Sequence, residues 1–116
     1  MTRRIVLLAL LFLGFAAVAG AMEGPGASVS GWIYQAGSET GAPGSGTAIP
    51  GLRVSLVHPQ LGRSHPDISD ERGHFELTAI PPMSTPYFLE IYWGKTLVYR
   101  RELRVQGDVE LGGVGI

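Results

Sequence analysis

From residue 28 onward, apolar and polar side chains alternate in short runs, which is the two-residue period of β-strands. Glycine, proline and other turn-forming residues separate these runs. No stretch of this region holds apolar residues at the sustained spacing of about 3.6 that a helix would need. The pattern therefore predicts an all-β sandwich. The predicted strands cover residues 28–34, 51–57, 75–77, 87–93, 96–105 and 109–116.

The alternation also predicts which side chains face the core. In each strand one set of alternate residues is apolar and is expected to point inward. Arg101 falls on the inward face of the 96–105 strand, so we expect either a bulge or a solvated strand end there. The residues predicted to point inward or to be available to the core are Val29, Gly31, Ile33, Leu52, Val54, Leu56, Phe75, Leu77, Tyr87, Leu89, Ile91, Trp93, Leu97, Tyr99, Leu103, Val105, Val109, Leu111, Val114 and Ile116.

A polar turn organises the middle of the chain. Ser69 and Asp70 favour turns because their side chains bond to nearby backbone groups, and Gly73 tolerates the positive φ that ends such a turn. A short strand follows. It must stop before Pro81 and Pro82, because proline cannot donate a hydrogen bond to a β-ladder.

The N-terminal segment has the layout of a secretory signal peptide. Arg3 and Arg4 form a basic start, and an apolar run that ends among small residues follows them. The run of about 15 residues is shorter than the roughly 20 that span a bilayer, and no basic stop-transfer cluster follows it. We therefore expect a helical signal peptide at 1–21, cleaved after Ala19 or Ala21, and no stable membrane anchor in the mature chain.

Composition limits the partners, the chemistry and the cellular compartment that the mature domain can have. Removing Arg3 and Arg4 with the signal peptide changes the formal net charge from −1 to −3, and this mildly acidic balance argues against nucleic acid as a partner. The lack of cysteine excludes disulfides, cysteine-based zinc sites, thiol catalysis and a lipid-bearing cysteine. We expect a flexible lead-in at 22–27 and one domain at 28–116, in a periplasmic or secreted protein.

Two long connections interrupt the strands. Residues 35–50 are rich in Gly, Ser, Thr, Ala and Pro, and we expect them to form a long mobile loop. Residues 58–72 form a second long connection, broken by Pro59 and Pro66. Loops of this length in a small domain are more often functional or disordered than merely connective.

Five short motifs follow one another along nearly the whole mature chain. They are Val29-x-Gly31-x-Ile33, the run from Pro50 to Leu56, Ser69-Asp70-x-x-Gly73-x-Phe75-x-Leu77, Ile80-Pro81-Pro82 and Tyr87-x-Leu89-x-Ile91. In this order they resemble the carboxypeptidase regulatory-like domain family. The resemblance implies a transthyretin-like (prealbumin-like) fold, a single Greek-key β-sandwich of about seven short strands. Residues 84–86 depart from the simple glycine turn of the family, and the 35–50 loop is longer than its usual short hairpin.

The resemblance also implies a function. Such domains are mostly non-catalytic accessories of peptidases or outer-membrane transporters, or they stand alone in the periplasm. We therefore expect an exported, non-enzymatic module that binds or scaffolds a protein, peptide or surface polysaccharide and uses no cofactor. The related hydroxyisourate hydrolases carry a terminal Tyr-Arg-Gly-Ser, which residues 113–116 do not match. A small-ligand carrier of the transthyretin type, a dimer with a central channel, is an alternative, and the oligomeric state stays open.

The candidates for catalytic or metal chemistry lie in the 58–72 connection. His58, His65 and Asp67 are weak candidates for a metal site, which would support the alternative of a small metal-assisted hydrolase. No spacing fixes two ligands on one element, so we expect these loop histidines to be solvated and no metal to bind. Asp70 is better explained by its turn than by acid–base chemistry, and no serine has the Gly-x-Ser-x-Gly context of a nucleophile.

Three aromatic residues mark a possible binding surface: Trp32, Tyr34 and Tyr92. Trp32 and Tyr34 alternate with the inward residues of their strand and should lie on its outer face. Either a loop lying across them or a binding surface would explain two aromatics there. Binding by strand addition at an exposed sheet edge is the other mode considered. The arginines within 100–104 are expected to form a solvated strand face.

Overall fold

The computed structural model describes residues 26–42 and 44–116. The predicted signal peptide at 1–21, its cleavage site and residues 22–25 of the predicted lead-in lie outside these residues. Within the described part of the chain, no helix has the length and apolar character needed to cross a membrane.

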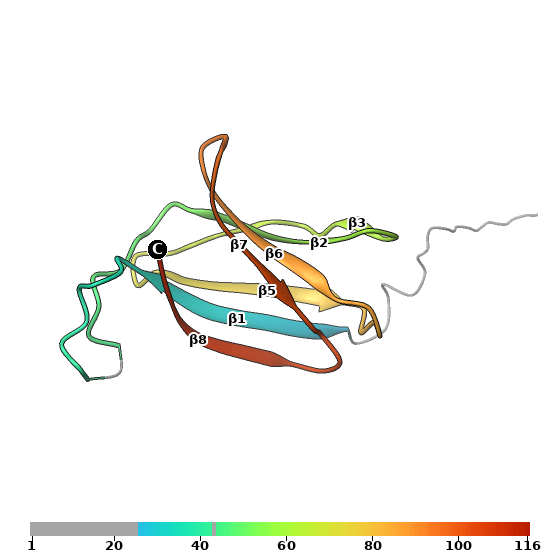
Figure 1. The fold of residues 1–116 in the computed structure, drawn as a ribbon, viewed down its shortest axis with the longest axis horizontal. Coiled ribbons are helices and arrows are strands. Elements are labelled where there is room, and N and C mark those ends of the chain that lie inside the picture. Colours follow the sequence, from blue (N-terminus) through green and yellow to red (C-terminus); the bar gives the residue numbers. More distant parts are fainter. Residues whose placement is uncertain (1–25, 43) are drawn as a thin grey trace, which may run out of the picture.

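The described residues fold into two β-sheets (Figure 1). One sheet has three strands in the order β5-β1-β8, with β1 antiparallel to β5 and parallel to β8. The other has five strands in the order β3-β2-β6-β7, with β4 also paired to β2, and all its pairings are antiparallel. The strands are β1 (Ala27–Tyr34), β2 (Arg53–His58), β3 (Gly62–Arg63), β4 (Asp67–Ile68), β5 (His74–Ile80), β6 (Tyr87–Trp93), β7 (Thr96–Leu103) and β8 (Val109–Gly115).

The predicted all-β sandwich is confirmed. The described residues form eight strands, where the family resemblance implied about seven. They are the six strands that the pattern predicted and two more in the 58–72 connection, because β3 and β4, two residues each, both pair with β2. Strand β1 begins at Ala27, inside the predicted lead-in. The other six strands lie at the predicted positions, separated by the turn-forming residues. The prediction therefore missed only the two shortest strands.

The core lies between the two sheets and is made mainly of the predicted inward residues. Gly31 lets the Phe75 ring approach, since a Cβ built on Gly31 would lie 3.2 Å from that ring. The described residues contain no cysteine, so apolar burial has to stabilise the sandwich without a disulfide. The buried apolar residues are Ala27, Val29, Ile33, Leu52, Val54, Leu56, Phe75, Leu77, Ile80, Tyr87, Leu89, Ile91, Leu103, Val105 and Val114.

Two predicted core residues are wrong. Trp93 is 60% exposed and Leu97 is 44% exposed. Both belong to the tip of the β6–β7 hairpin, which extends away from the rest of the sandwich (Figure 1). Trp93 has no opposing sheet to pack against there, and the register shift between Ile91 and Tyr92 turns Leu97 to the outer side of the sheet, opposite Tyr92. The register shifts opposite Leu97–Tyr99, between Ile91 and Tyr92, rather than beside Arg101. Arg101 pairs regularly with Leu89 and is exposed, so the solvated strand end is the alternative that holds.

The turn before β5 is built as its residues predict. The Oδ1 atom of Asp70 accepts hydrogen bonds from the backbone N–H groups of Arg72 and His74, each at 2.9 Å. These bonds hold the pKa of Asp70 below its ordinary value, with the His74 bond as the largest cause. Gly73 has a φ of 77°. The structural explanation of Asp70 is therefore confirmed.

Candidate binding surface

The outer face of the five-stranded sheet gathers arginine and aromatic side chains from four strands. Directly paired residues of neighbouring antiparallel strands point to the same side of a sheet, and the inward alternates Val54, Leu56, Leu89 and Ile91 are buried. The outward residues therefore form three rows across β4, β2, β6 and β7. These rows are Ile68–Arg53–Tyr92–Leu97, Ser55–Glu90–Arg100 and Val57–Phe88–Glu102.

Arg63 of β3 joins this surface through its long side chain. It reaches Glu90 on β6 and the hydroxyl of Ser55 on β2. We call the set of Arg53, Arg63, Phe88, Glu90, Tyr92 and Arg100 the arginine–aromatic face.

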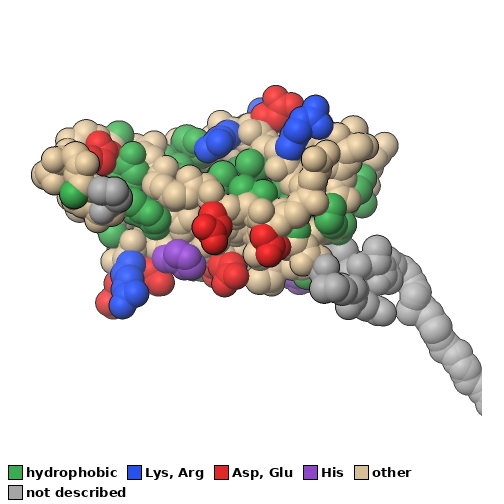
Figure 2. Space-filling model, turned by 90° about the horizontal axis from the view of Figure 1, so that it is seen from below, with side chains coloured by type: hydrophobic (Ala, Val, Ile, Leu, Met, Phe, Trp, Pro, Cys, Tyr) green, Lys and Arg blue, Asp and Glu red, His purple; other side chains and the backbone are tan. Residues whose placement is uncertain are grey.

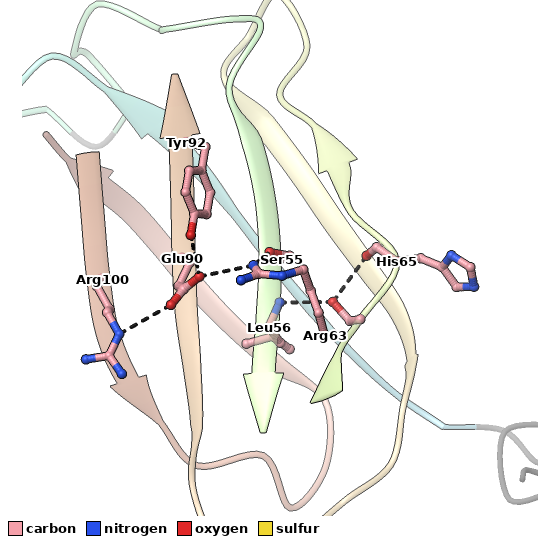
Figure 3. Close-up of polar contacts among 8 residues, drawn as sticks. Ser55, Leu56, Arg63, His65, Glu90, Tyr92 and Arg100 are labelled. Atoms are coloured by element: carbon pink, nitrogen blue, oxygen red, sulfur yellow. Dashed lines mark hydrogen bonds and ion pairs between the residues drawn. The ribbon is translucent and has the colours of Figure 1, made fainter. Parts of the chain in front are cut away.

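Glu90 is the centre of this face (Figure 3). Its carboxylate lies 3.0 Å from Arg63 Nη1 and 3.3 Å from Arg100 Nε, and it accepts a hydrogen bond of 2.9 Å from the Tyr92 hydroxyl. Arg63 also donates to Ser55 at 2.7 Å. Although Glu90 is on the outer side of the sheet, it is only 8% exposed. The side chains that bury this carboxylate therefore also pair with its charge and donate a hydrogen bond to it.

The electrostatics of Glu90 follow from these contacts. Burial alone would raise the pKa of this carboxyl, because removal from water penalises the charged form. Hydrogen bonds from Tyr92 and Arg63 and the nearby positive charge outweigh burial and hold the pKa below its ordinary value. For Arg63, burial acts against the charged form, but Glu90 reverses the effect and raises the guanidinium pKa. The pair stays ionised at neutral pH.

Cation–π contacts fix the arginines against the aromatic rings. The Arg53 guanidinium lies 5.0 Å from the centre of the Tyr92 ring, and the Arg63 guanidinium lies 5.6 Å from it. Arg100 lies 3.9 Å above the centre of the Phe88 ring. Planar guanidinium groups stack in this way more readily than ammonium groups do. Two aromatic rings and three positive charges are thus held in defined positions on one open sheet face.

The chemistry of this surface suits recognition. Arginine and tyrosine are enriched in protein interfaces, where they account for many of the residues that carry most of the binding energy. Arg63 and Arg100 share the Glu90 carboxylate, whereas no ion pair joins Arg53 to another described residue. The Arg53 charge is therefore available to an acidic group on a partner.

The three aromatics predicted to mark a binding surface do not meet. Tyr92 belongs to the arginine–aromatic face, whereas Trp32 and Tyr34 lie on β1, in the opposite sheet. The Trp32 and Tyr34 rings lie 5.1 Å apart. Glycines of β8 and of the 35–50 loop pack closely on Tyr34: a Cβ built on Gly46 would lie 2.8 Å from its ring. A loop therefore lies across Tyr34, one of the two explanations offered for it.

The 35–50 loop is anchored at both ends. Its first residue, Gln35, donates a backbone hydrogen bond of 2.8 Å to Thr47, and Ile49 donates one of 3.0 Å to Ile33. These bonds, with the antiparallel bridge between Tyr34 and Ala48, pair the loop with the C-terminal end of β1 and bring the loop's Gly46 to the Tyr34 ring.

His58 is not the solvated loop residue that the sequence suggested. It ends β2, is 1% exposed and packs edge-on against Tyr87 at 5.0 Å between ring centres. Its Nδ1 accepts a hydrogen bond of 3.1 Å from the Gln60 backbone N–H, which leaves the proton on Nε2 to donate to Thr85 Oγ1 at 2.6 Å. The expectation failed because the proline at position 59 ends the strand after His58 rather than before it.

The other metal candidates are not brought to His58. His65 is exposed, and the carboxylate of Asp67 accepts backbone hydrogen bonds from Ile68 at 2.9 Å and Glu76 at 2.7 Å. Within residues 26–42 and 44–116, no group of three or more His, Cys, Asp or Glu side chains is placed to hold a metal ion. Asp67, the first residue of β4, instead links β4 to β5 through Glu76.

Sequence reasoning missed most of the arginine–aromatic face. The pattern placed Phe88, Glu90 and Tyr92 on the outer side of their strand, and an acidic residue between two outward aromatics was the available signal. The partners Arg53 and Arg63 come from other strands. Only the pairing register shows that they converge on Glu90 and Tyr92.

Comparisons with known proteins support the fold class. No protein-family model matches the chain, and no curated protein matches it. Its fold is similar to that of BcpA, the major pilin subunit of Bacillus cereus, in a crystal structure, with a TM-score of 0.54 and 12% sequence identity. The match covers 78% of this chain and 30% of that pilin chain. At this identity the likeness concerns the β-sandwich fold alone, and the resemblance to the carboxypeptidase regulatory-like family stays a hypothesis.

Proposed function

We propose that this chain is an exported, non-enzymatic β-sandwich module that binds or scaffolds a partner in the cell envelope through its arginine–aromatic face. The observation that carries the proposal is the ordered set of guanidinium groups and aromatic rings around Glu90 on an open sheet face. Because contacts with Glu90 and the rings already restrict these side chains, less conformational entropy is lost when a partner docks.

A protein or peptide partner suits this surface better than a surface polysaccharide. The face combines Tyr92, Phe88 and the exposed Ile68 and Leu97 with arginines, which is the composition of protein interfaces. The exposed apolar residues would gain from burial against another apolar surface. A polysaccharide is the alternative outcome of the experiment below.

Three features support export without catalysis. The N-terminal residues have the signal-peptide layout, and the cysteine-free chain needs no particular redox compartment. The titratable group at the centre of the face, Glu90, is engaged by two arginines and a tyrosine, which hold its pKa below its ordinary value, so it stays ionised and is a poor proton donor or acceptor at neutral pH. The fold likeness to a major pilin subunit agrees with a surface role.

The proposal is tested with the purified mature protein, immobilised and exposed to a detergent extract of the source cell envelope. Retention of a specific partner by the wild type should be lost in Tyr92→Ala and in Arg53→Ala. Thr78→Ala, an exposed change on the opposite sheet, is the matched control and should retain it. Protease treatment of the extract identifies a protein partner, and periodate treatment identifies a polysaccharide. Equal retention by all three variants would overturn the proposal.

A further inference from the structure

The two outer faces of the sandwich differ in charge, because Arg53, Arg63 and Arg100 outnumber Glu90 and Glu102 on the five-stranded sheet, whereas the three-stranded sheet presents mainly carboxylates. Apart from Arg72, every Lys and Arg among the described residues lies in or directly beside a strand of the five-stranded sheet. These residues are Arg53, Arg63, Lys95, Arg100, Arg101 and Arg104.

The three-stranded sheet has an acidic outer face. In register across its strands, Glu76 of β5 and Glu110 of β8 flank Ser30 of β1, and both glutamates are exposed. Next to this row, the exposed Asp108 accepts a hydrogen bond of 2.9 Å from the Ser28 backbone N–H. We call Glu76, Asp108 and Glu110 the acidic face. Figure 2 shows acidic side chains over the middle of the side on which β8, β1 and β5 lie, with Lys and Arg side chains toward its rims.

The two faces also match in spacing. Neighbouring strands lie about 4.8 Å apart, so the backbones of Glu76 and Glu110, one strand to either side of β1, are about 10 Å apart. Arg53 of β2 and Arg100 of β7 flank β6 with the same separation across the strands, and they lie in neighbouring rows, opposite Tyr92 and Glu90. Between the acidic side chains, β1 presents Ser28 and Ser30, and Trp32 is the next outward residue along the strand. Between the arginines, β6 presents the rings of Phe88 and Tyr92.

We infer that the arginine–aromatic face of one molecule docks on the acidic face of a second copy of this chain. The aromatic rings of β6 lie over the serines of β1, and Arg53 meets the glutamate on one side. Arg100 meets the glutamate on the other side, since its side chain is 50% exposed although it pairs with Glu90. The inference rests on the binding role proposed for the arginine–aromatic face and names its partner. Charge complementarity favours a second copy as the partner, because each molecule presents a basic face on one sheet and an acidic face on the other.

The geometry sets the kind of assembly. Since the two faces belong to opposite sheets, the contact is head-to-tail and leaves one free face at each end of a dimer. Such a heterologous contact builds open chains of molecules unless its rotation closes a ring. Contacts between charged side chains near the surface weaken as salt is added.

The test is sedimentation of the mature protein and of two charge-reversal variants, Arg53→Glu and Glu110→Arg. Both residues are exposed, and neither takes part in the ion pairs of Glu90, so both variants should keep the fold. The wild type should associate with rising concentration at about 50 mM salt and dissociate at about 500 mM. Each variant alone should bind itself at least about tenfold more weakly.

An equimolar mixture of the two variants should recover association. The Glu110→Arg protein keeps its arginine–aromatic face and the Arg53→Glu protein keeps its acidic face, so each supplies what the other lacks. Circular dichroism confirms that both are folded. A wild type that stays monomeric at low salt, or variants that associate as strongly as the wild type, would overturn the inference. If such a monomer still retained an envelope partner lost in Tyr92→Ala, the proposed function would stand without self-association.

Discussion

The carbonyl oxygen of Gly73 accepts a hydrogen bond of 2.7 Å from the backbone N–H of Ile33, which ties the turn before β5 to strand β1. A Cβ built on Gly73 would collide with the carbonyl oxygen of Ile33. The positive φ of Gly73 is also unfavourable for residues with a side chain. Only glycine satisfies both the turn and this close approach.

Gly73→Ala should therefore lower the free energy of unfolding by about 2–4 kcal/mol, through backbone strain and displacement of β1. Gly94→Ala is the control. Gly94 also has a positive φ, 60°, but a Cβ there meets nothing within 4 Å, so only the conformational cost of about 1–2 kcal/mol remains. Urea denaturation measures both. Equal losses would show that the contact with Ile33 contributes nothing.

Substitutions at adjacent positions of β5 test its register. Phe75 is fully buried in the core, and Phe75→Ala should lower the free energy of unfolding by about 3–5 kcal/mol. Glu76 points to solvent on the other side, and Glu76→Ala should change it by less than about 0.5 kcal/mol. Chemical denaturation that ranked the two substitutions in the reverse order would mean that the strand is misregistered.

The same alternation explains why the sequence predicted the sandwich interior better than its surface. The core lies on one side of β5, so the alternation of apolar and polar residues is enough to predict that Phe75 points inward. Trp93 follows the same period but extends past the opposing sheet, and local pattern holds no information on where that sheet ends. Whether His58 is buried depends on Thr85 and Tyr87, which lie far along the chain. The arginine–aromatic face depends on pairing between strands in the same way.

Processing of the N-terminal segment is a further prediction. If the small residues that end the apolar run form the cleavage site, the exported protein should begin at Gly20 or Met22. N-terminal sequencing of protein recovered outside the cytoplasm measures this directly. An intact Met1 on a membrane-bound product would contradict it.

Zinc calorimetry tests the metal-assisted alternative. Both ring nitrogens of His58 are engaged by Gln60 and Thr85, and His65 lies on an exposed segment without a second histidine at ligand spacing. We expect no stoichiometric binding tighter than about 1 μM. Tight binding that disappeared in His58→Ala or His65→Ala would restore the small hydrolase as a candidate.

The ion pairs of Glu90 should make stability depend on pH. The pKa of Glu90 is lower in the folded protein than its ordinary value of 4.5, so the folded state releases this proton more readily than the unfolded chain does. The resulting stabilisation is fully present above about pH 4.5 and is lost as the pH falls through the folded-state pKa. The substitution Glu90→Gln removes this stabilisation. At pH 7 the substitution should lower the free energy of unfolding by about 1–3 kcal/mol, because Arg63 and Arg100 lose their shared carboxylate.

Denaturation of the wild type and of Glu90→Gln between pH 7 and pH 3 measures this contribution. The difference between the two proteins should shrink as the pH falls below about 4.5, since protonation of Glu90 makes the wild type resemble the variant. Glu102→Gln is the control, because Glu102 is exposed on the same face, and its effect should stay below about 1 kcal/mol across the range. A difference in free energy of unfolding between the wild type and Glu90→Gln that stayed constant down to pH 3 would mean that the carboxylate charge does not stabilise the face. Tyr92 and the arginines would then be held by stacking alone.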